Sequence, residues 1–222
     1  MSFDLARFAE ECGVEDPGRF AERCELLRKF LEECNRCVNL TRLTAEDDFR
    51  IKHAADSLSI ARFFPELATG KFTVADIGCG AGFPSLILAL AFPRLEIWAI
   101  DSVGKKIDFV RQAAEKCSLA NLHAVHGRSS ELNCREEFQG KFDIVTARAV
   151  AVSAKICREA SRFPSRRGRF IFYKTPKQAE EEKEALAAIK NVSWKNTEVF
   201  RLPGDAGERL FTVGTPLRHH AG

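Results

Sequence analysis

The chain has 222 residues, of which 45% are hydrophobic and 29% are charged, the composition of a globular protein with one sizeable domain. No apolar run reaches the roughly 20 residues that cross a bilayer, and the N-terminus carries Asp4 and Arg7 in place of a signal-peptide core. We therefore expect a cytoplasmic protein with no membrane partner. The net charge of +3 is too small to indicate nucleic-acid binding by itself.

The first 65 residues have a helical pattern. Apolar residues recur at three- and four-residue spacing, which places them on one face of a helix: Phe20, Cys24, Leu27, Phe30, Leu31 and Cys34. A second helix is expected over residues 53–64, and the Pro- and Gly-containing residues 65–70 break the pattern. We expect a helical extension over residues 1–68 and a second domain over residues 69–222.

From residue 71 the pattern alternates between strands and helices. Strands are expected over residues 72–77, 95–100, 122–125, 142–146 and 169–173, and helices over 84–91, 105–117, 151–163 and 177–190. Such alternation predicts a parallel sheet with helices on both faces. The last two apolar runs, 194–200 and 209–214, are separated by a short Pro-Gly-Asp-Ala-Gly turn and predict an antiparallel hairpin. The expected fold is α/β, a doubly wound, mostly parallel sheet of seven strands.

The turn after the first of these strands carries three alternating glycines, Gly78, Gly80 and Gly82, followed by Phe83. Glycines there let the backbone turn sharply and let a ligand approach closely. Asp101 ends the next strand, about 20 residues on, where a carboxylate can accept hydrogen bonds from ribose hydroxyls. Dinucleotide sites have the spacing G-x-G-x-x-G, and the bulky Phe83 favours a cofactor with an adenosine but no phosphates. We predict S-adenosylmethionine, with a nicotinamide-dependent oxidoreductase as the alternative.

Other candidate residues follow from the rule that ligands of open α/β sheets bind beyond the carboxyl ends of the strands. Ser102, Ser129 and Ser130 follow two such ends and are predicted to contact the cofactor. Arg148 and Lys174 follow two others and are predicted to be catalytic. A buried cation needs a partner, so each is alternatively a structural ion pair with one of three acids: Asp76, Asp101 or Asp143.

Basic residues and cysteines give weaker signals. Arg166 and Arg167 belong to a group of arginines around a turn, which is either solvated surface or a set of phosphate contacts. We assign these two to substrate binding. The eight cysteines are scattered, and in a cytoplasmic protein we expect them to be reduced. The one Cys-x-x-Cys pair, Cys34 and Cys37, has no second pair or histidines near it, so we expect no metal.

Several motifs together resemble one family over residues 26–178. They are Asn35-x3-Asn39-Leu40-Thr41, His53-x2-Asp56-Ser57-Leu58, the glycine stretch from Asp76 to Pro84, Asp101-Ser102-x2-Lys105-Lys106-x2-Phe109 and Arg148-Ala149-Val150-Ala151. They resemble bacterial ribosomal RNA small subunit methyltransferase G, also called glucose-inhibited division protein B. The resemblance implies a class I S-adenosylmethionine-dependent methyltransferase that methylates N7 of a guanine in 16S rRNA, as free rRNA or in the small ribosomal subunit. We expect the enzyme to be a monomer.

The resemblance also implies roles for particular residues. Arg148 would contact the cofactor, and Asn39, His53, Asp56 and Ser57 would contact the substrate. One departure is Arg128-Ser129-Ser130-Glu131, where the family has Arg-Ala-Glu-Glu, so an adenine contact at Ser130 would rest on backbone groups. The lone pair of guanine N7 is free at neutral pH, so alignment of the two reactants can supply most of the catalysis. A non-catalytic RNA-binding module would explain the arginines but not the glycine turn with Asp101.

Overall fold

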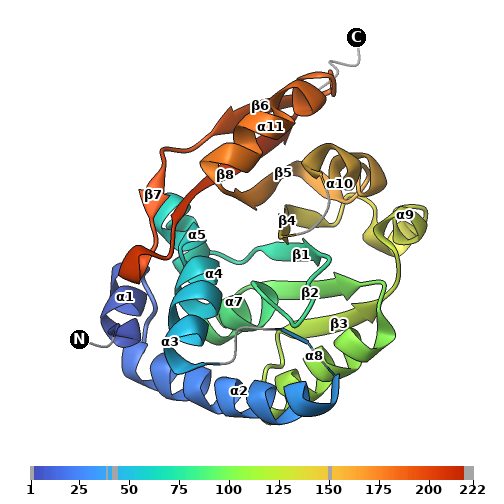
Figure 1. The fold of residues 1–222 in the computed structure, drawn as a ribbon. Coiled ribbons are helices and arrows are strands. Elements are labelled where there is room, and N and C mark those ends of the chain that lie inside the picture. Colours follow the sequence, from blue (N-terminus) through green and yellow to red (C-terminus); the bar gives the residue numbers. More distant parts are fainter. Residues whose placement is uncertain (1–2, 39, 42–44, 150–151, 218–222) are drawn as a thin grey trace.

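The computed structural model in Figure 1 describes residues 3–38, 40–41, 45–149 and 152–217. Helices surround a central sheet of parallel and antiparallel strands, as the alternating pattern predicts. Within the described part of the chain, no helix is long and apolar enough to cross a membrane.

The N-terminal third is helical. It comprises α1 (Leu5–Glu11), α2 (Pro17–Val38), α3 (Glu46–Asp48), the π-helix η1 (Phe49–Ala55), α4 (Asp56–Leu58), α5 (Ile60–Phe63) and α6 (Glu66–Thr69). Most of the apolar stripe of α2 is buried, with Leu27 and Leu31 fully covered and Phe30 and Cys34 partly buried. The single helix predicted over residues 53–64 is instead a series of short helical segments that begins with α3 and η1. This segmented stretch brings the buried His53 and Asp56 to the edge of the sheet.

The sheet has the strand order β3-β2-β1-β4-β5-β8-β6. Its strands are β1 (Thr73–Ile77), β2 (Glu96–Asp101), β3 (Leu122–His126), β4 (Phe142–Arg148), β5 (Pro164–Lys174), β6 (Val192–Asn196), β7 (Phe200–Arg201) and β8 (Glu208–Pro216). The first five pair in parallel, and β8 lies antiparallel between β5 and β6. The seven-strand prediction holds along this path. The strand predicted over residues 194–200 is in fact two, since β6 ends at Asn196 and the short β7 pairs separately with β8.

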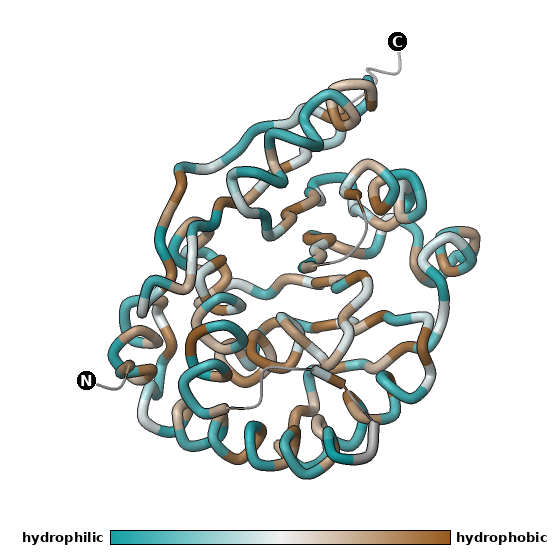
Figure 2. The backbone as a smooth tube through the Cα atoms, viewed as in Figure 1, coloured by the Kyte–Doolittle hydropathy of each residue, from teal (hydrophilic) through white to brown (hydrophobic). Residues whose placement is uncertain are grey.

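Helices cover both faces of the sheet, and each face has its own hydrophobic cluster. These helices are α7 (Ser85–Ala91), α8 (Gly104–Lys116), α9 (Ser129–Leu132), α10 (Ser153–Glu159) and α11 (Pro176–Ala187), with the short 3-10 turns η2 (Glu136–Phe138) and η3 (Pro203–Asp205). Every residue of α7 is buried, and one cluster runs from α1 and α2 through α7 and α8 to the sheet. The other packs α10 against the opposite face, and Figure 2 shows the apolar strands inside the more polar outer helices. The division of the chain at residue 68 stays a prediction.

This topology creates two adjacent places for a site along the carboxyl edge of the sheet. The strand order reverses between β1 and β4, and in open α/β sheets ligands bind at such switch points. The carboxyl ends of β1, β2 and β3 lie on one side of the switch, and those of β4 and β5 lie on the other.

Candidate functional site

The glycine turn after β1 has the backbone that its sequence predicts. Gly78, Gly80 and Gly82 have φ angles of +69°, +59° and +85°, which side chains with a Cβ rarely adopt. A Cβ at Gly82 would run into Leu86, whereas a Cβ at Gly80 would meet nothing closer than the Gly78 carbonyl oxygen at 4.0 Å. Gly82 therefore allows close packing of α7, and Gly80 leaves open space beside the turn.

Asp101 holds the turn after β1 against the turn after β2. Its Oδ2 accepts a hydrogen bond from the Gly80 backbone N–H at 3.0 Å, and its Oδ1 accepts one from the Val103 N–H at 2.9 Å. The Lys106 ammonium lies 3.8 Å from the same carboxylate. Asp101 thus organises the loop structure as well as facing the cavity described next.

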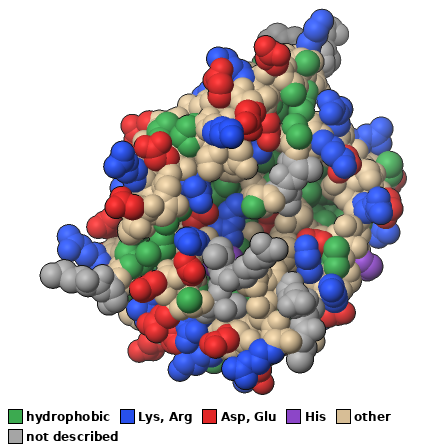
Figure 3. Space-filling model, viewed as in Figure 1, with side chains coloured by type: hydrophobic (Ala, Val, Ile, Leu, Met, Phe, Trp, Pro, Cys, Tyr) green, Lys and Arg blue, Asp and Glu red, His purple; other side chains and the backbone are tan. Residues whose placement is uncertain are grey.

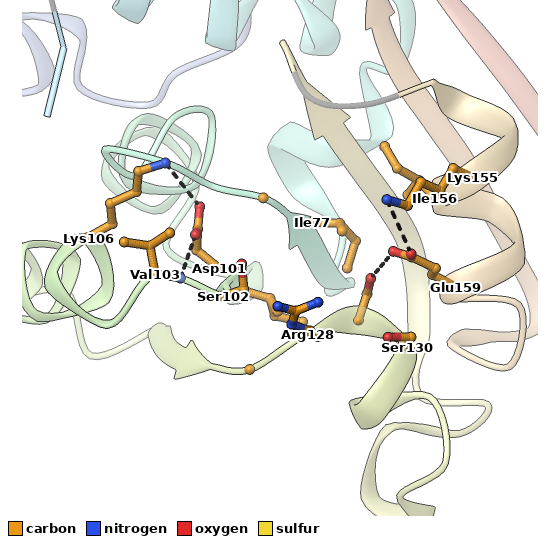
Figure 4. A pocket seen from close by; sticks show the side chains of 14 residues that line it. Ile77, Asp101, Ser102, Val103, Lys106, Arg128, Ser130, Lys155, Ile156 and Glu159 are labelled. Carbon is orange, nitrogen blue, oxygen red and sulfur yellow. Dashed lines mark hydrogen bonds and ion pairs between the residues drawn. The ribbon is translucent and has the colours of Figure 1, made fainter.

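A first cavity of about 390 Å³ opens beside this turn (Figure 4). Its lining comes from the ends of β1, β2 and β3 and from α10: Ile77, Gly78, Ile100, Asp101, Ser102, Val103, Lys106, Gly127, Arg128, Ser129, Ser130, Lys155, Ile156 and Glu159. Across it, the Ser129 hydroxyl donates to Glu159 at 3.0 Å, and Lys155 lies 3.8 Å from Glu159.

Five of the predicted cofactor contacts line this cavity and four do not. Gly78, Asp101, Ser102, Ser129 and Ser130 are brought together there. Gly80 and Gly82 shape the turn behind the lining, while Phe83 and Arg148 face elsewhere.

Three charged side chains of the first cavity were missed, Lys106, Lys155 and Glu159, and Arg128 follows a strand end but was given no role. Lys155 and Glu159 are spaced by four residues on the helix that follows a strand end, and this spacing was the available signal.

Phe83 forms a wall between two parts of the site. Its ring stacks on His53 with the centroids 4.2 Å apart, and the Arg148 guanidinium carbon lies 5.8 Å from the Phe83 centroid. Phe49 meets the same ring edge-on at 5.9 Å. The bulky residue after the glycines thus connects the glycine turn to the π-helix η1.

Arg148 is a partly buried cation whose partners differ from those expected. Its Nη1 donates to the Lys52 carbonyl oxygen at 3.0 Å and to Asp56 Oδ2 at 3.2 Å, and its Nη2 lies 3.4 Å from His53 Nδ1. The acid is Asp56, so the prediction of Asp76, Asp101 or Asp143 as its ion-pair partner is wrong. A guanidinium can only donate, so His53 Nδ1 is the acceptor in this contact.

Asp56 joins Arg148 to the C-terminal hairpin. Its second oxygen, Oδ1, lies 3.2 Å from Nε of Arg209 in β8. Asp56 and the adjacent Ser57 are buried, and the Ser57 carbonyl oxygen accepts a hydrogen bond from the Tyr173 hydroxyl at 2.7 Å. The short helix α4 is therefore fixed to β4, β5 and β8 at once.

A second cavity of about 400 Å³ lies over these groups, beyond the ends of β4 and β5. It is lined by Thr41, Lys52, His53, Asp56, Arg148, Ala149, Tyr173, Lys174, Thr175, Gln178 and Arg209. Four of these are cations and only Asp56 is an acid, so the cavity suits an anionic ligand. In Figure 3, Lys and Arg side chains gather around the hollowed centre of the face shown.

Lys174 is held at the rim of the second cavity by Glu182 of α11, with the ammonium 2.8 Å from Oε1. Burial works against ionisation of Glu182, but hydrogen bonds from Lys174 and Ser153 outweigh it and lower the pKa of Glu182. Here too the acid differs from the three candidates, Asp76, Asp101 and Asp143, so that ion-pair prediction is wrong. The Lys174 ammonium has three protons and can donate further hydrogen bonds into the cavity.

The predicted substrate residues are only partly brought together. His53 and Asp56 line the second cavity, while the Ser57 side chain is buried beneath it. Asn39 lies outside the described residues. Arg166 and Arg167 are exposed at the amino end of β5, and Lys174 lies at its carboxyl end.

Comparison with known proteins decides the family. The model of the rRNA small subunit methyltransferase G family (GidB) matches residues 21–207. The chain belongs to this family. It is 37% identical over 195 residues to ribosomal RNA small subunit methyltransferase G of Lactobacillus helveticus, covering 86% of this chain and 81% of the relative. It is 38% identical to that of Limosilactobacillus reuteri over 94% of this chain and 86% of the relative.

Solved structures of other methyltransferases share the fold. A putative S-adenosyl-L-methionine-dependent methyltransferase from Methanococcus maripaludis gives a TM-score of 0.61 at 13% identity, covering 88% of this chain and 94% of the other. An O-methyltransferase from Bacillus cereus in complex with SAH gives 0.60 at 14% identity, covering 86% and 90%. The family match therefore favours the methyltransferase over the oxidoreductase and over the RNA-binding module. Among the described residues, no group of His, Cys, Asp and Glu could hold a metal ion.

Proposed function

We propose that this chain transfers the methyl group of S-adenosylmethionine to N7 of a guanine in 16S rRNA. The observation that carries the proposal is the pair of cavities on either side of the switch point, one beside the glycine turn and one lined by cations. Family membership supports the reaction, and the two cavities supply separate places for the methyl donor and the nucleotide.

The residues of the first cavity fit the cofactor. The open space beside Gly80 and the positive φ angles of the turn let a ligand approach the backbone. Asp101 faces the same cavity with a carboxylate that can accept from ribose hydroxyls, while Ser129 and Ser130 line the side where an adenine would lie. When bound, the cofactor supplies a methyl group already activated on a sulfonium.

The second cavity suits the target nucleotide. Its cations can neutralise the phosphates next to the guanine. Lys174 and Arg209 have N–H groups that can donate further hydrogen bonds there. Arg148, by contrast, already donates to Lys52, His53 and Asp56. We propose that Arg148 fixes the His53–Phe83 wall, against which the base is aligned. Because N7 has a free lone pair, this chain needs only to orient the guanine and exclude water.

Further proposals concern the whole protein. We propose that it acts as a monomer in the cytoplasm, and that its helical segment 1–68 supplies one wall of the nucleotide site.

The test is to map 7-methylguanosine in 16S rRNA from cells with and without this protein, and then to restore the mark with purified protein and S-adenosylmethionine. A single guanine that loses its methyl group in the deleted strain and regains it in vitro supports the proposal. Unchanged methylation in the deleted strain, together with no transfer in vitro, would overturn it.

A further inference from the structure

Four arginines form an unpaired group on the edge of the sheet opposite the two cavities. We name Arg158, Arg162, Arg166 and Arg167 the arginine edge. All four are exposed, and none forms an ion pair with an acid in the described parts of the chain. Arg158 lies near the end of α10, which leads into the amino end of β5.

The backbone that carries the arginine edge is firmly held. The Arg162 N–H donates to Asn133 Oδ1 at 2.8 Å, and its carbonyl oxygen accepts from the Gly140 N–H at 2.7 Å. Phe163 is fully buried, and Gly168 packs so closely on β4 that a Cβ there would run into the Phe142 carbonyl oxygen. Between these anchors the register of β4 and β5 shifts, so the segment with Arg166 and Arg167 bulges from the ladder. Because the backbone is already fixed, little backbone entropy would be lost on binding a partner.

Several other surface cations are paired within the protein. Lys29, Arg111 and Lys183 each pair with an acid one turn away on the same helix. Arg169, adjacent in sequence to the arginine edge, pairs with Glu66 and lies over the Phe64 ring at 4.7 Å. The arginine edge therefore combines a fixed backbone with guanidinium groups that have no partner in the described chain.

We propose that the arginine edge binds the phosphodiester backbone of the rRNA away from the nucleotide that is methylated. The planar guanidinium matches phosphate oxygens bidentately, and several such contacts along a rigid edge suit a polyanion rather than a single small ion. Arg169 is already roughly 16 Å from Lys174 at the usual rise along a strand, and Arg166 lies beyond it in the bulge, so Arg166 and Lys174 are too far apart to touch one nucleotide. The partner is therefore folded RNA that extends over the side of the sheet. Naming rRNA as the partner rests on the proposed function.

The first test measures binding, not catalysis. The affinity for full-length 16S rRNA is measured over a series of salt concentrations, with S-adenosylhomocysteine present, for the parent and for a variant with Arg158, Arg162, Arg166 and Arg167 changed to Gln. The slope of log affinity against log salt should fall by roughly 3, since each phosphate contact contributes just under one unit. The matched control changes Arg7, Lys29, Arg111 and Lys183 to Gln, because these cations pair with acids of their own helices. The control variant should have a salt slope near that of the parent.

The second test separates long-range binding from the reaction. The arginine-edge variant should raise KM for full-length 16S rRNA by roughly tenfold or more, with unchanged kcat and unchanged affinity for S-adenosylhomocysteine. On a short RNA hairpin that carries only the target guanine and its loop, parent and variant should perform alike. The double variant Arg166→Gln with Arg167→Gln gives a milder version if the quadruple variant unfolds.

Three outcomes would overturn the inference. They are an unchanged salt slope in both arginine variants, an equal fall in the control variant, and equal KM values on full-length 16S rRNA. A parent protein that binds 16S rRNA but methylates no guanine would refute the proposed function and leave the salt-slope test of the arginine edge intact.

Discussion

The two cavities on the carboxyl edge of the sheet are built in different ways. The first is made by loops that directly follow β1, β2 and β3 and by α10, and its charges are mixed, with Asp101 and Glu159 facing Lys106, Arg128 and Lys155. The second draws on the η1 and α4 segment, β4, β5, β8 and α11, and cations dominate it. The difference fits the proposal that the first cavity binds the cofactor through local turns, while the second depends on the tertiary structure and binds the nucleotide.

The largest expected effect comes from Arg148→Lys in the second cavity. Lysine keeps the charge but loses the planar fork that donates to Lys52, His53 and Asp56 at once. We expect single-turnover methyl transfer to fall roughly 100-fold, the scale for loss of a positioned donor, while the affinity for S-adenosylhomocysteine is unchanged. A large loss of that affinity would instead place Arg148 with the first cavity, as a partner of the cofactor carboxylate.

The next effect concerns stability. Asp56→Asn leaves the partly buried Arg148 and Arg209 without their shared, buried carboxylate, and removing one partner from a buried ion pair costs about 3 kcal/mol. The control is Asp48→Asn, which breaks a surface ion pair with Lys52 and should cost less than about 1 kcal/mol. Urea unfolding at pH 7 measures both. Equal stabilities of the two variants would mean that Asp56 is not the joint between η1, β4 and β8.

The difference between the cavities also explains what the sequence could predict. Gly78, Asp101, Ser102 and Ser129 were found because each follows a strand end, and strand ends are visible as transitions in hydrophobic pattern. Arg209 was missed because it lies in the C-terminal hairpin, far along the chain from Asp56, and only folding brings the two together. The contacts of Arg148 were misassigned for the same reason.

The break between β6 and β7 has a local cause that the hydrophobic pattern of the sequence does not reveal. The break between β6 and β7 comes at Thr197, whose backbone and side chain both bond to Phe211 and end the regular pairing. Threonine is an ordinary strand residue, so nothing in the composition of residues 194–200 marks the interruption.

A smaller effect is expected in the first cavity. Asp101→Ala should weaken binding of S-adenosylhomocysteine by about 2 kcal/mol, within the range for a hydrogen bond to a charged group. Calorimetry measures the affinity, and Asp101→Asn serves as the milder comparison because its amide keeps one acceptor. If thermal stability falls while affinity does not, the carboxylate serves only to hold the Gly80 and Val103 N–H groups.

A further effect of similar size concerns Asp76, which interacts electrostatically with Arg148 of the second cavity and Asp101 of the first. Burial raises the pKa of Asp76 from 3.8 to about 6, hydrogen bonds from Ser85 and the charge of Arg148 oppose this shift, and Asp101 adds to it. Because the folded protein holds the Asp76 proton more tightly than the unfolded chain does, protonated Asp76 stabilises the fold. This contribution is fully present below pH 3.8 and is lost as the pH rises through 6. The unfolding free energy of the parent, minus that of Asp76→Asn, should therefore fall by about 2 kcal/mol between pH 4 and pH 7. A difference that rises with pH would contradict this sign.

The same carboxyl group can report which cavity has been changed. Removing the positive charge with Arg148→Gln should raise the pKa of Asp76 further, because the opposing cation is lost. Removing the negative charge with Asp101→Asn should lower it, because a neighbouring like charge is lost. Carbon NMR of the Asp76 carboxyl between pH 4 and pH 8 measures both shifts, and Glu180→Gln, on the exposed face of α11, should leave the titration unmoved. Shifts of the same sign in the Arg148 and Asp101 variants would show that Asp76 senses a general change in burial and not the separate charges of the two cavities.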